Sequence, residues 1–251
     1  MEVGRQELTN LALATLVMFL FFGMTTLLSL GFHRARRSAP GLRAAATGLL
    51  TYPNCTFLGL PLCRALFGDI AILYNAAAVI TFNVLFFTVQ YNLFTGKGFR
   101  WKNLMTPPVL STVGLILMLL LGLHFPAPVQ TVVSNTGAMI TPLSLIIIGV
   151  MMSEHSLSAV LKEKLCYLIT LLRNLVIPLL AMLVLRLIPI DAASRLCVLV
   201  YIACPCATLT TIYAIQNDME PELCARAVLL STLLFSLTLP VIITLGQRFL
   251  L

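Results

Sequence analysis

The sequence predicts an all-α, polytopic membrane protein with about eight transmembrane helices. Hydrophobic residues make up 59% of the chain and charged residues only 10%, whereas a water-soluble domain is about half apolar and about a quarter charged. The mean hydropathy of +1.00 is also typical of a bilayer protein. In addition, the apolar residues fall in runs of about 20, the length that a helix needs to cross the hydrocarbon core.

These runs define eight expected transmembrane spans that are joined by short, charged connections. Their approximate limits are 9–32, 44–67, 70–94, 104–124, 128–152, 163–188, 195–216 and 222–248. The basic residues lie in the connections and do not form one face, so the net charge of +7 indicates membrane topology and not nucleic-acid binding. The seven cysteines lie almost entirely within or at the ends of the spans, which argues against a disulfide framework.

The distribution of Lys and Arg predicts an orientation. The first, third and fifth connections hold Arg34, Arg36, Arg37, Arg43, Lys97, Arg100, Lys102, Lys162 and Lys164. Because cytoplasmic loops carry an excess of Lys and Arg, we expect a multi-pass protein of the plasma membrane, here a bacterial inner membrane, with both termini outside. The seventh connection is acidic at Asp218 and Glu220, but acidic residues contribute little to this rule.

Two spans are interrupted at mid-depth by proline and small polar residues. Residues 44–67 contain Tyr52-Pro53-Asn54-Cys55-Thr56, and residues 195–216 contain Cys204-Pro205-Cys206 with Thr208 shortly after. Proline removes an intrahelical hydrogen bond and frees a carbonyl. Broken helices in matching positions of two halves point to the binding site of a secondary transporter, and their opposite directions predict an inverted repeat.

The predicted repeats are unequal. Residues 1–96 form the first repeat, with three helices, and residues 97–251 form the second, with five. A pair of complete five-helix repeats would need two more helices at the N-terminus. We therefore expect either an internal or truncated start or a natural short form.

The interruptions provide the candidate substrate site. Half-helix N-termini offer N–H groups and about half a positive charge each, which suits a small carboxylate. The expected substrate-binding residues are Pro53, Asn54, Cys55, Thr56, Pro205, Cys206, Thr208, Asn135 and Arg173. The alternative is that the prolines only kink helices whose freed backbone groups are satisfied locally.

Arg173 and Asn135 are the two candidates outside the interruptions. Arg173 lies inside the sixth span, where an unpaired cation costs about 2.5 to 3.5 kcal/mol on insertion scales. Its charge is expected either to attract the anion or form a gate, or to reach the interface or pair with carbonyls freed by a kink. Asn135 is expected on the scaffold side of the cavity.

The sequence leaves the driving force open. No Asp or Glu lies deep in a span, which argues against a proton relay through a buried acid. Sodium could bind carbonyls and hydroxyls at the crossing, or the membrane potential could drive an anion alone. We expect no cofactor, no metal and no enzyme: Cys204 and Cys206 could bind monovalent copper, but the chain lacks the soluble ATP-hydrolysing domains of copper pumps.

Five motifs, in order along the chain, resemble those of the auxin efflux carrier family. They are Asn54 to Pro61, Thr141 to Gly149, Arg173 to Pro178, Cys204 to Thr208, and Leu229 to Pro240. The resemblance implies ten helices in two inverted repeats, with crossed broken helices, an architecture shared with bile-acid symporters and antiporters. A transport domain would comprise 1–96 and 160–251, beside a partial scaffold at 103–155.

The resemblance also implies a function. It is the transport of a small organic anion, such as a malonate-, malate- or auxin-like carboxylate, by alternating access in the lipid bilayer. One alternative is a sodium-coupled organic-anion symporter of the bile-acid-symporter type. Another is a truncated carrier that senses its anion without moving it. The scaffold helices would be the natural surface of a homodimer.

Overall fold

The computed structural model confirms that the chain is all-α, and it describes residues 5–98, 102, 105, 107–123, 125–139, 142–143, 146, 149–150 and 157–250. The helices are α1 (Arg5–Ala35), α2 (Pro40–Thr51), η1 (Cys55–Gly59), α3 (Leu60–Phe67), α4 (Ile70–Leu85), η2 (Phe86–Gln90), α5 (Tyr91–Thr95), α6 (Pro107–Leu120), α7 (Ala127–Ala138), α9 (Leu157–Lys162), α10 (Lys164–Leu171), η4 (Leu172–Val176), α11 (Ile177–Leu185), α12 (Ala192–Ala203), α13 (Thr208–Gln216) and α14 (Pro221–Leu250). The segments named η are single π-helical turns that continue into α-helix.

Among the described residues, four continuous helices are long and apolar enough to cross a membrane. They are Gln6–Ala35, Ile70–Thr95, Lys164–Leu185 and Pro221–Leu250. They coincide with four of the expected spans. Three shorter apolar helices overlap three more of the expected spans: Cys55–Phe67, Val109–Met118 and Ala192–Ala203. Much of the span expected at 128–152, including most of the motif Thr141 to Gly149, lies outside the described residues.

Both expected interruptions are present, and each has the same local cause. Steric contact with a proline ring pushes the preceding residue out of the helical region. Tyr52, before Pro53, accordingly has φ −97° and ψ 116°, and Cys204, before Pro205, has φ −52° and ψ 147°. The helices α2 and α12 therefore end at these positions, and η1 and α13 begin a few residues later.

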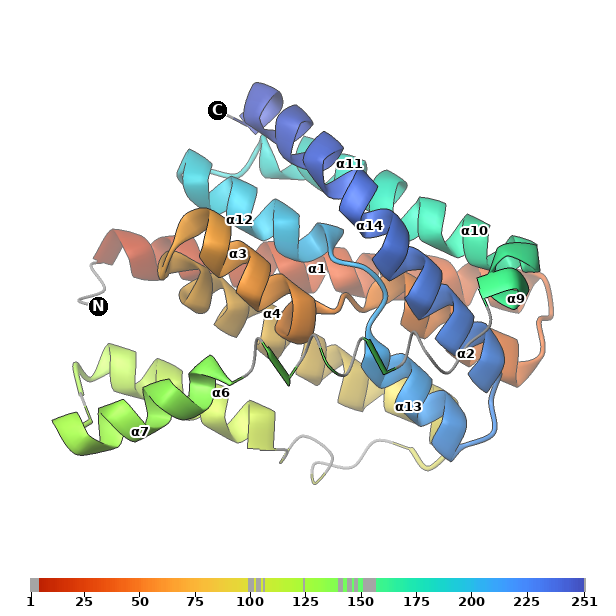
Figure 1. Ribbon diagram of the computed structural model, residues 1–251, viewed down its shortest axis with the longest axis horizontal. Coiled ribbons are helices and arrows are strands. Elements are labelled where there is room, and N and C mark those ends of the chain that lie inside the picture. The colour runs from red at the N-terminus through yellow and green to blue at the C-terminus, as the bar shows by residue number, and fades with distance from the viewer. Residues whose placement is uncertain are drawn as a thin grey trace.

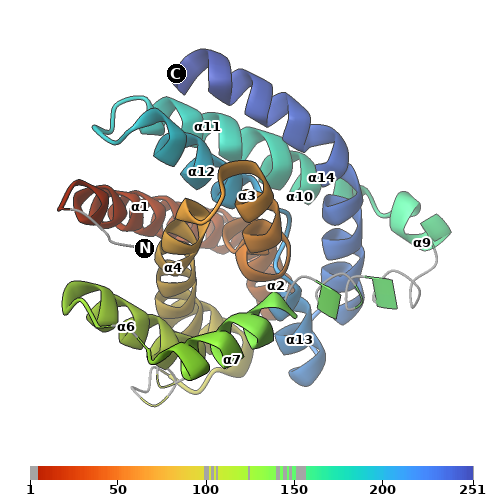
Figure 2. The same cartoon turned by 60° about the vertical axis from the view of Figure 1, so that its left-hand side comes forward.

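The helices are arranged around the two broken spans (Figure 1). On one side α14 packs against α10, α11 and α12, and on the other α1 packs against α2 and α4. The pair α6 and α7 lies at one edge, with α6 against α4 (Figure 2). The broken helices thus lie between two groups of continuous helices.

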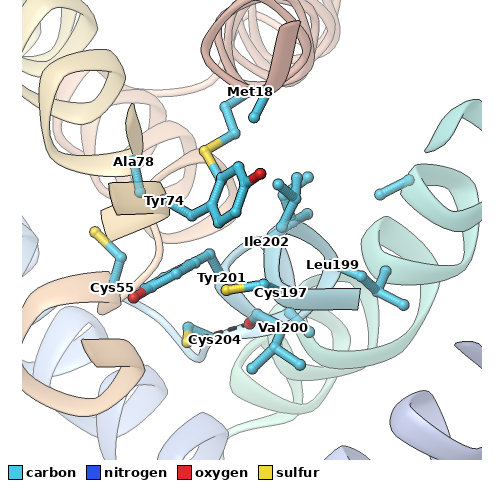
Figure 3. Packing of buried hydrophobic residues seen from close by; sticks show 14 of the residues in the cluster. Met18, Cys55, Tyr74, Ala78, Cys197, Leu199, Val200, Tyr201, Ile202 and Cys204 are labelled. Atoms are coloured by element: carbon cyan, nitrogen blue, oxygen red, sulfur yellow. Dashed lines mark hydrogen bonds between the residues drawn. The ribbon is translucent and has the colours of Figure 1, made fainter. Parts of the chain in front are cut away.

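The core around α12 combines aromatic rings, thiols and small side chains. Tyr201 extends from α12 toward Cys55, and Met18 of α1 lies against the ring of Tyr74 (Figure 3). The Tyr201 hydroxyl donates to the carbonyl of Ala71, with an O···O distance of 2.8 Å. Since Tyr201 and Tyr74 are both buried, this packing fixes α12 against the first broken span and α4.

Contacts at or beside the connections place the first, fifth and seventh connections at one end of the helices. A Cβ on Gly41 would lie 3.6 Å from Cγ of Glu220, which joins the first and seventh connections. Arg226 pairs with Glu163 at 3.9 Å, which joins the seventh and the fifth. At the opposite end, Asn10 donates to Asp191, with an N···O distance of 2.7 Å.

Candidate functional site

The two interrupted spans cross each other and satisfy each other's backbone. Pro53 and Cys206 form an isolated antiparallel bridge. The Asn54 amide donates to the Pro205 carbonyl at 2.8 Å, and the Ala207 amide donates to the Tyr52 carbonyl at 3.0 Å. Two backbone segments about 150 residues apart in sequence therefore form one unit.

Arg173 holds the carbonyl ends of both helices that enter the crossing. The last carbonyls of a helix have no intrahelical partner and carry partial negative charge. The Arg173 guanidinium donates to the Ile202 carbonyl at 2.7 Å, to Cys204 at 3.1 Å and to Leu50 at 3.4 Å. Its side chain is fully buried, with 0% exposure. This is the pairing with freed carbonyls that the sequence offered as one alternative.

A second set of polar contacts supports the crossing from the side of α14. The Cys206 amide donates to the Ser231 hydroxyl at 3.2 Å, and this hydroxyl donates to the Val228 carbonyl at 3.1 Å. Asn174, the neighbour of Arg173 in η4, donates to the Ser231 carbonyl at 2.7 Å. The backbone of Cys206 is therefore held from the side of the crossing where α14 and η4 lie.

Glycine permits the close approach of the two broken spans. A Cβ at Gly59 would lie 2.9 Å from Sγ of Cys204 and 3.1 Å from Cδ1 of Tyr201, closer than real contacts of this kind. A Cβ at Gly48 would lie 2.6 Å from Cγ2 of Thr210. The packing at the crossing consequently has no space for even a methyl group at these two positions.

A cavity of about 610 Å³ opens on the other side of the crossing. Its lining residues are Pro53, Asn54, Cys55, Thr56, Phe57, Asn75, Val79, Phe82, Asn83, Pro107, Ser111, Thr112, Ala207, Thr208 and Leu209. The lining thus includes Pro53, Asn54, Cys55, Thr56 and Thr208 of the expected site. The volume falls within the range of small-molecule sites.

Four of the expected residues are not part of this lining. Pro205 and Cys206 form the backbone of the crossing, and Arg173 lies behind it against the carbonyl ends. Asn135 is exposed on α7. The structure therefore brings the two interruptions together with Arg173, and it leaves Asn135 apart.

The described lining of the cavity is uncharged and mostly apolar, with a few polar groups among the apolar side chains. It combines hydroxyl and carboxamide groups with apolar side chains, and no Asp, Glu, Lys, Arg or His is among these residues. The first turns of η1 and α13 border it through Cys55, Thr56 and Thr208, where helical N–H groups lack intrahelical acceptors. The Asn54 side-chain amide lies 3.5 Å from the Thr208 hydroxyl. The site therefore offers N–H and O–H donors at its border with the two helix N-termini.

The α4 wall of the cavity was missed by the sequence interpretation. Asn75, Val79, Phe82 and Asn83 follow helical spacing and share one face of α4. Neither Asn75 nor Asn83 is among the substrate-binding residues expected from the sequence. Oδ1 of Asn75 is buried without a hydrogen-bond partner among the described residues, and Nδ2 of Asn83 donates to the Val79 carbonyl at 2.8 Å. The helical spacing of these residues could be read from the sequence, but the sequence could not show that this face of α4 borders the cavity.

The chain has apolar helices of membrane-spanning length and two broken spans that cross, with an uncharged cavity at the crossing. Together these features define a membrane-embedded transporter. The sequence matches the family described as membrane transport protein over residues 2–102 and 96–243. The chain therefore belongs to this family, and the resemblance to auxin efflux carriers is confirmed. The family is one of transporters and not of enzymes. No curated protein matches the chain.

Proposed function

We propose that the protein moves a small organic anion, with at least one carboxylate, across the bilayer by alternating access. The observation that carries the proposal is an uncharged, mostly apolar cavity bordered by the first turns of two helices, η1 and α13. Each helix N-terminus is equivalent to about half a positive charge. Together they suit one negative charge. The apolar side chains Phe57, Val79 and Phe82 would contact the rest of the substrate.

Arg173 supports anion binding without touching the substrate. The C-terminal ends of α2 and α12 together carry about one negative charge, which would repel an anion at the crossing. The guanidinium that binds the Leu50, Ile202 and Cys204 carbonyls offsets this charge. The positive potential of the two N-termini then remains available to the substrate.

In the proposed architecture, the two crossed spans belong to a domain that moves beside a scaffold. Two inverted repeats, 1–96 and 97–251, would carry eight membrane crossings, with both termini outside a bacterial inner membrane. A transport domain made of 1–96 and 160–251 would move against the scaffold at 103–155, and scaffold helices would pair in a homodimer. Asn135 on α7 would then belong to the scaffold.

The test is uptake of radiolabelled mono- and dicarboxylates into proteoliposomes containing the full chain. Asn54→Asp keeps the size of a side chain that lines the cavity and adds a negative charge. Because like charges repel strongly where water is scarce, we expect uptake to fall by more than about tenfold. The matched control is Asn217→Asp: Asn217 bonds to the Tyr213 carbonyl at 2.8 Å, is not among the lining residues, and should leave uptake unchanged.

Two further arms separate the alternatives. Uptake that requires an inward sodium gradient would establish symport, and uptake that follows an imposed potential alone would establish uniport. Binding of the carboxylate without any flux would instead identify a sensor. If Asn54→Asp transports as well as the unmodified protein, while remaining folded in size-exclusion chromatography, the crossing is not the substrate site.

A further inference from the structure

We propose that the first connection, with the last turns of α1, binds the phosphate of an anionic phospholipid. The site would consist of Arg36 and Arg37, supported by Arg34 and Arg43, with the acyl chain lying along the outer face of α1. Binding of this lipid is separate from binding of substrate at the crossing. Its chemistry is an oxyanion held by guanidinium groups at the level of the membrane interface.

A row of exposed apolar side chains on α1 leads directly to these arginines. Leu20, Met24, Leu28 and Phe32 are four residues apart, so each lies about one turn from the next along a ridge on the outer surface of the helix, and each is at least half exposed. Arg36 continues the same row, and its amide donates to the Phe32 carbonyl at 3.0 Å. A surface that changes from apolar to cationic along one helix face matches a phospholipid and not a free anion.

Phe32 fixes the direction of Arg36. The guanidinium carbon of Arg36 lies 5.0 Å from the centre of the Phe32 ring, within the range of a cation–π contact. Phe32 itself is 54% exposed and lies among the outward-facing residues of α1. The contact therefore holds the guanidinium over the bilayer-facing side of the helix, where headgroup phosphates are found.

The positive charge of this connection is not neutralised by ion pairs within the described part of the chain. The sequence contains no Asp or Glu from residue 8 to residue 68. The ion pairs of the described residues involve Arg64 and Arg226, and none involves the arginines from 34 to 43. An acidic residue, Glu220, lies beside Gly41 in this connection. A cluster of Lys and Arg next to a transmembrane helix attracts anionic lipids by about 1 kcal/mol per residue, which is about fivefold in affinity.

The backbone holds the arginines in a defined turn. The Arg37 amide donates to the Arg34 carbonyl and the Ser38 amide to the His33 carbonyl, each at 3.0 Å, and the Ser38 hydroxyl bonds the His33 ring. Arg37 has φ 52°, a left-handed conformation at a helix end that glycine adopts without strain. A bulky cation at this position indicates a role for its side chain that outweighs the strain.

The test measures lipid retained by the purified full chain after exchange into micelles that contain equal amounts of phosphatidylglycerol and phosphatidylcholine. We expect the unmodified protein to retain phosphatidylglycerol preferentially, by native mass spectrometry. Arg36→Gln should lower this retention about fivefold. Arg37→Gly should lower the retention of phosphatidylglycerol by the same factor. Because glycine preserves the turn, the thermal midpoint of this variant should not fall. Phe32→Leu keeps the apolar row but removes the ring, and it should also lower retention.

The control is Arg186→Gln, which removes an exposed cation from the opposite end of the helices. It should retain phosphatidylglycerol like the unmodified protein. Equal losses in Arg186→Gln and Arg36→Gln would show only a general attraction of a basic protein to anionic lipid and would overturn the proposal. Unchanged retention in Arg36→Gln and Arg37→Gly would also overturn it. Displacement of the lipid by millimolar inorganic phosphate would show a site for free phosphate and not for a lipid.

Discussion

Arg173 shows how a single buried cation can organise a membrane protein. It reaches three backbone carbonyls from two helices and has no carboxylate partner among the described ion pairs. A fully buried charge would normally be too costly in a bilayer unless other groups compensate it. Here, the carbonyl ends of two broken helices provide that compensation, and the guanidinium in turn satisfies those carbonyls.

Replacing Arg173 by Met should destabilise the protein. The substitution leaves three buried carbonyls without their charged donor, and each unsatisfied acceptor costs about 1 to 3 kcal/mol. We therefore expect a loss of about 3 kcal/mol or more, measured as the thermal midpoint in detergent. Arg173→Lys keeps the charge but not the planar fork, so it should recover part of the loss. A midpoint for Arg173→Met equal to that of the unmodified protein would contradict this role.

At the scale of elements, the broken spans depend on close approach of one helix to another. Gly59 lies in the π-helical turn η1, directly against Cys204 and Tyr201. Small residues allow such approach in membrane proteins, where association is driven largely by packing. The close approach of η1 to α12 therefore depends on the absence of a side chain at Gly59.

Gly59→Ala should lower stability by about 1 to 3 kcal/mol because the added methyl group overpacks the crossing. The better helix propensity of Ala offsets about 1 kcal/mol of this. Adding Cys204→Ala removes the atom 2.9 Å from the new Cβ, so the double variant should be more stable than the sum of the single effects predicts. Gly23→Ala in α1 is the control, since a Cβ there meets nothing within 4 Å. Additive effects of Gly59→Ala and Cys204→Ala would mean that the two residues do not compete for space.

At the scale of the whole molecule, the first, fifth and seventh connections gather at one end of the helices. Contacts between Gly41 and Glu220, and between Arg226 and Glu163, support this grouping. Two of the three basic connections, the first and the fifth, therefore lie at the same end, which is consistent with the positive-inside rule. Eight crossings and the orientation in the membrane stay predictions.

Cysteine labelling can test the sidedness directly. All seven native cysteines are free and buried, so an impermeant maleimide should give little background. We expect Ala39→Cys and Lys97→Cys to react only from the cytoplasmic side and Leu187→Cys only from the outside, in sealed vesicles of known orientation. Reaction of Ala39→Cys and Leu187→Cys from the same side would disprove this topology.

The sequence by itself determined the all-α class, the positions of the long apolar helices and the two breaks. These follow from local properties: hydropathy over about 20 residues, and the steric effect of a proline on the residue before it. Tyr52 and Cys204 have the extended backbone that this effect requires. Pattern reasoning therefore identified the interruptions correctly.

Only the tertiary structure decided what each interruption contacts. The pairing of Asn54 with Pro205, the carbonyl partners of Arg173 and the position of Asn75 on the cavity wall all depend on segments far apart in sequence. Asn135, expected on the scaffold side of the cavity, is exposed on α7 and is not among the lining residues described, so its role stays a prediction. Hydropathy and helical period show which face of a helix is polar, but the partner of that face is fixed by packing between distant helices.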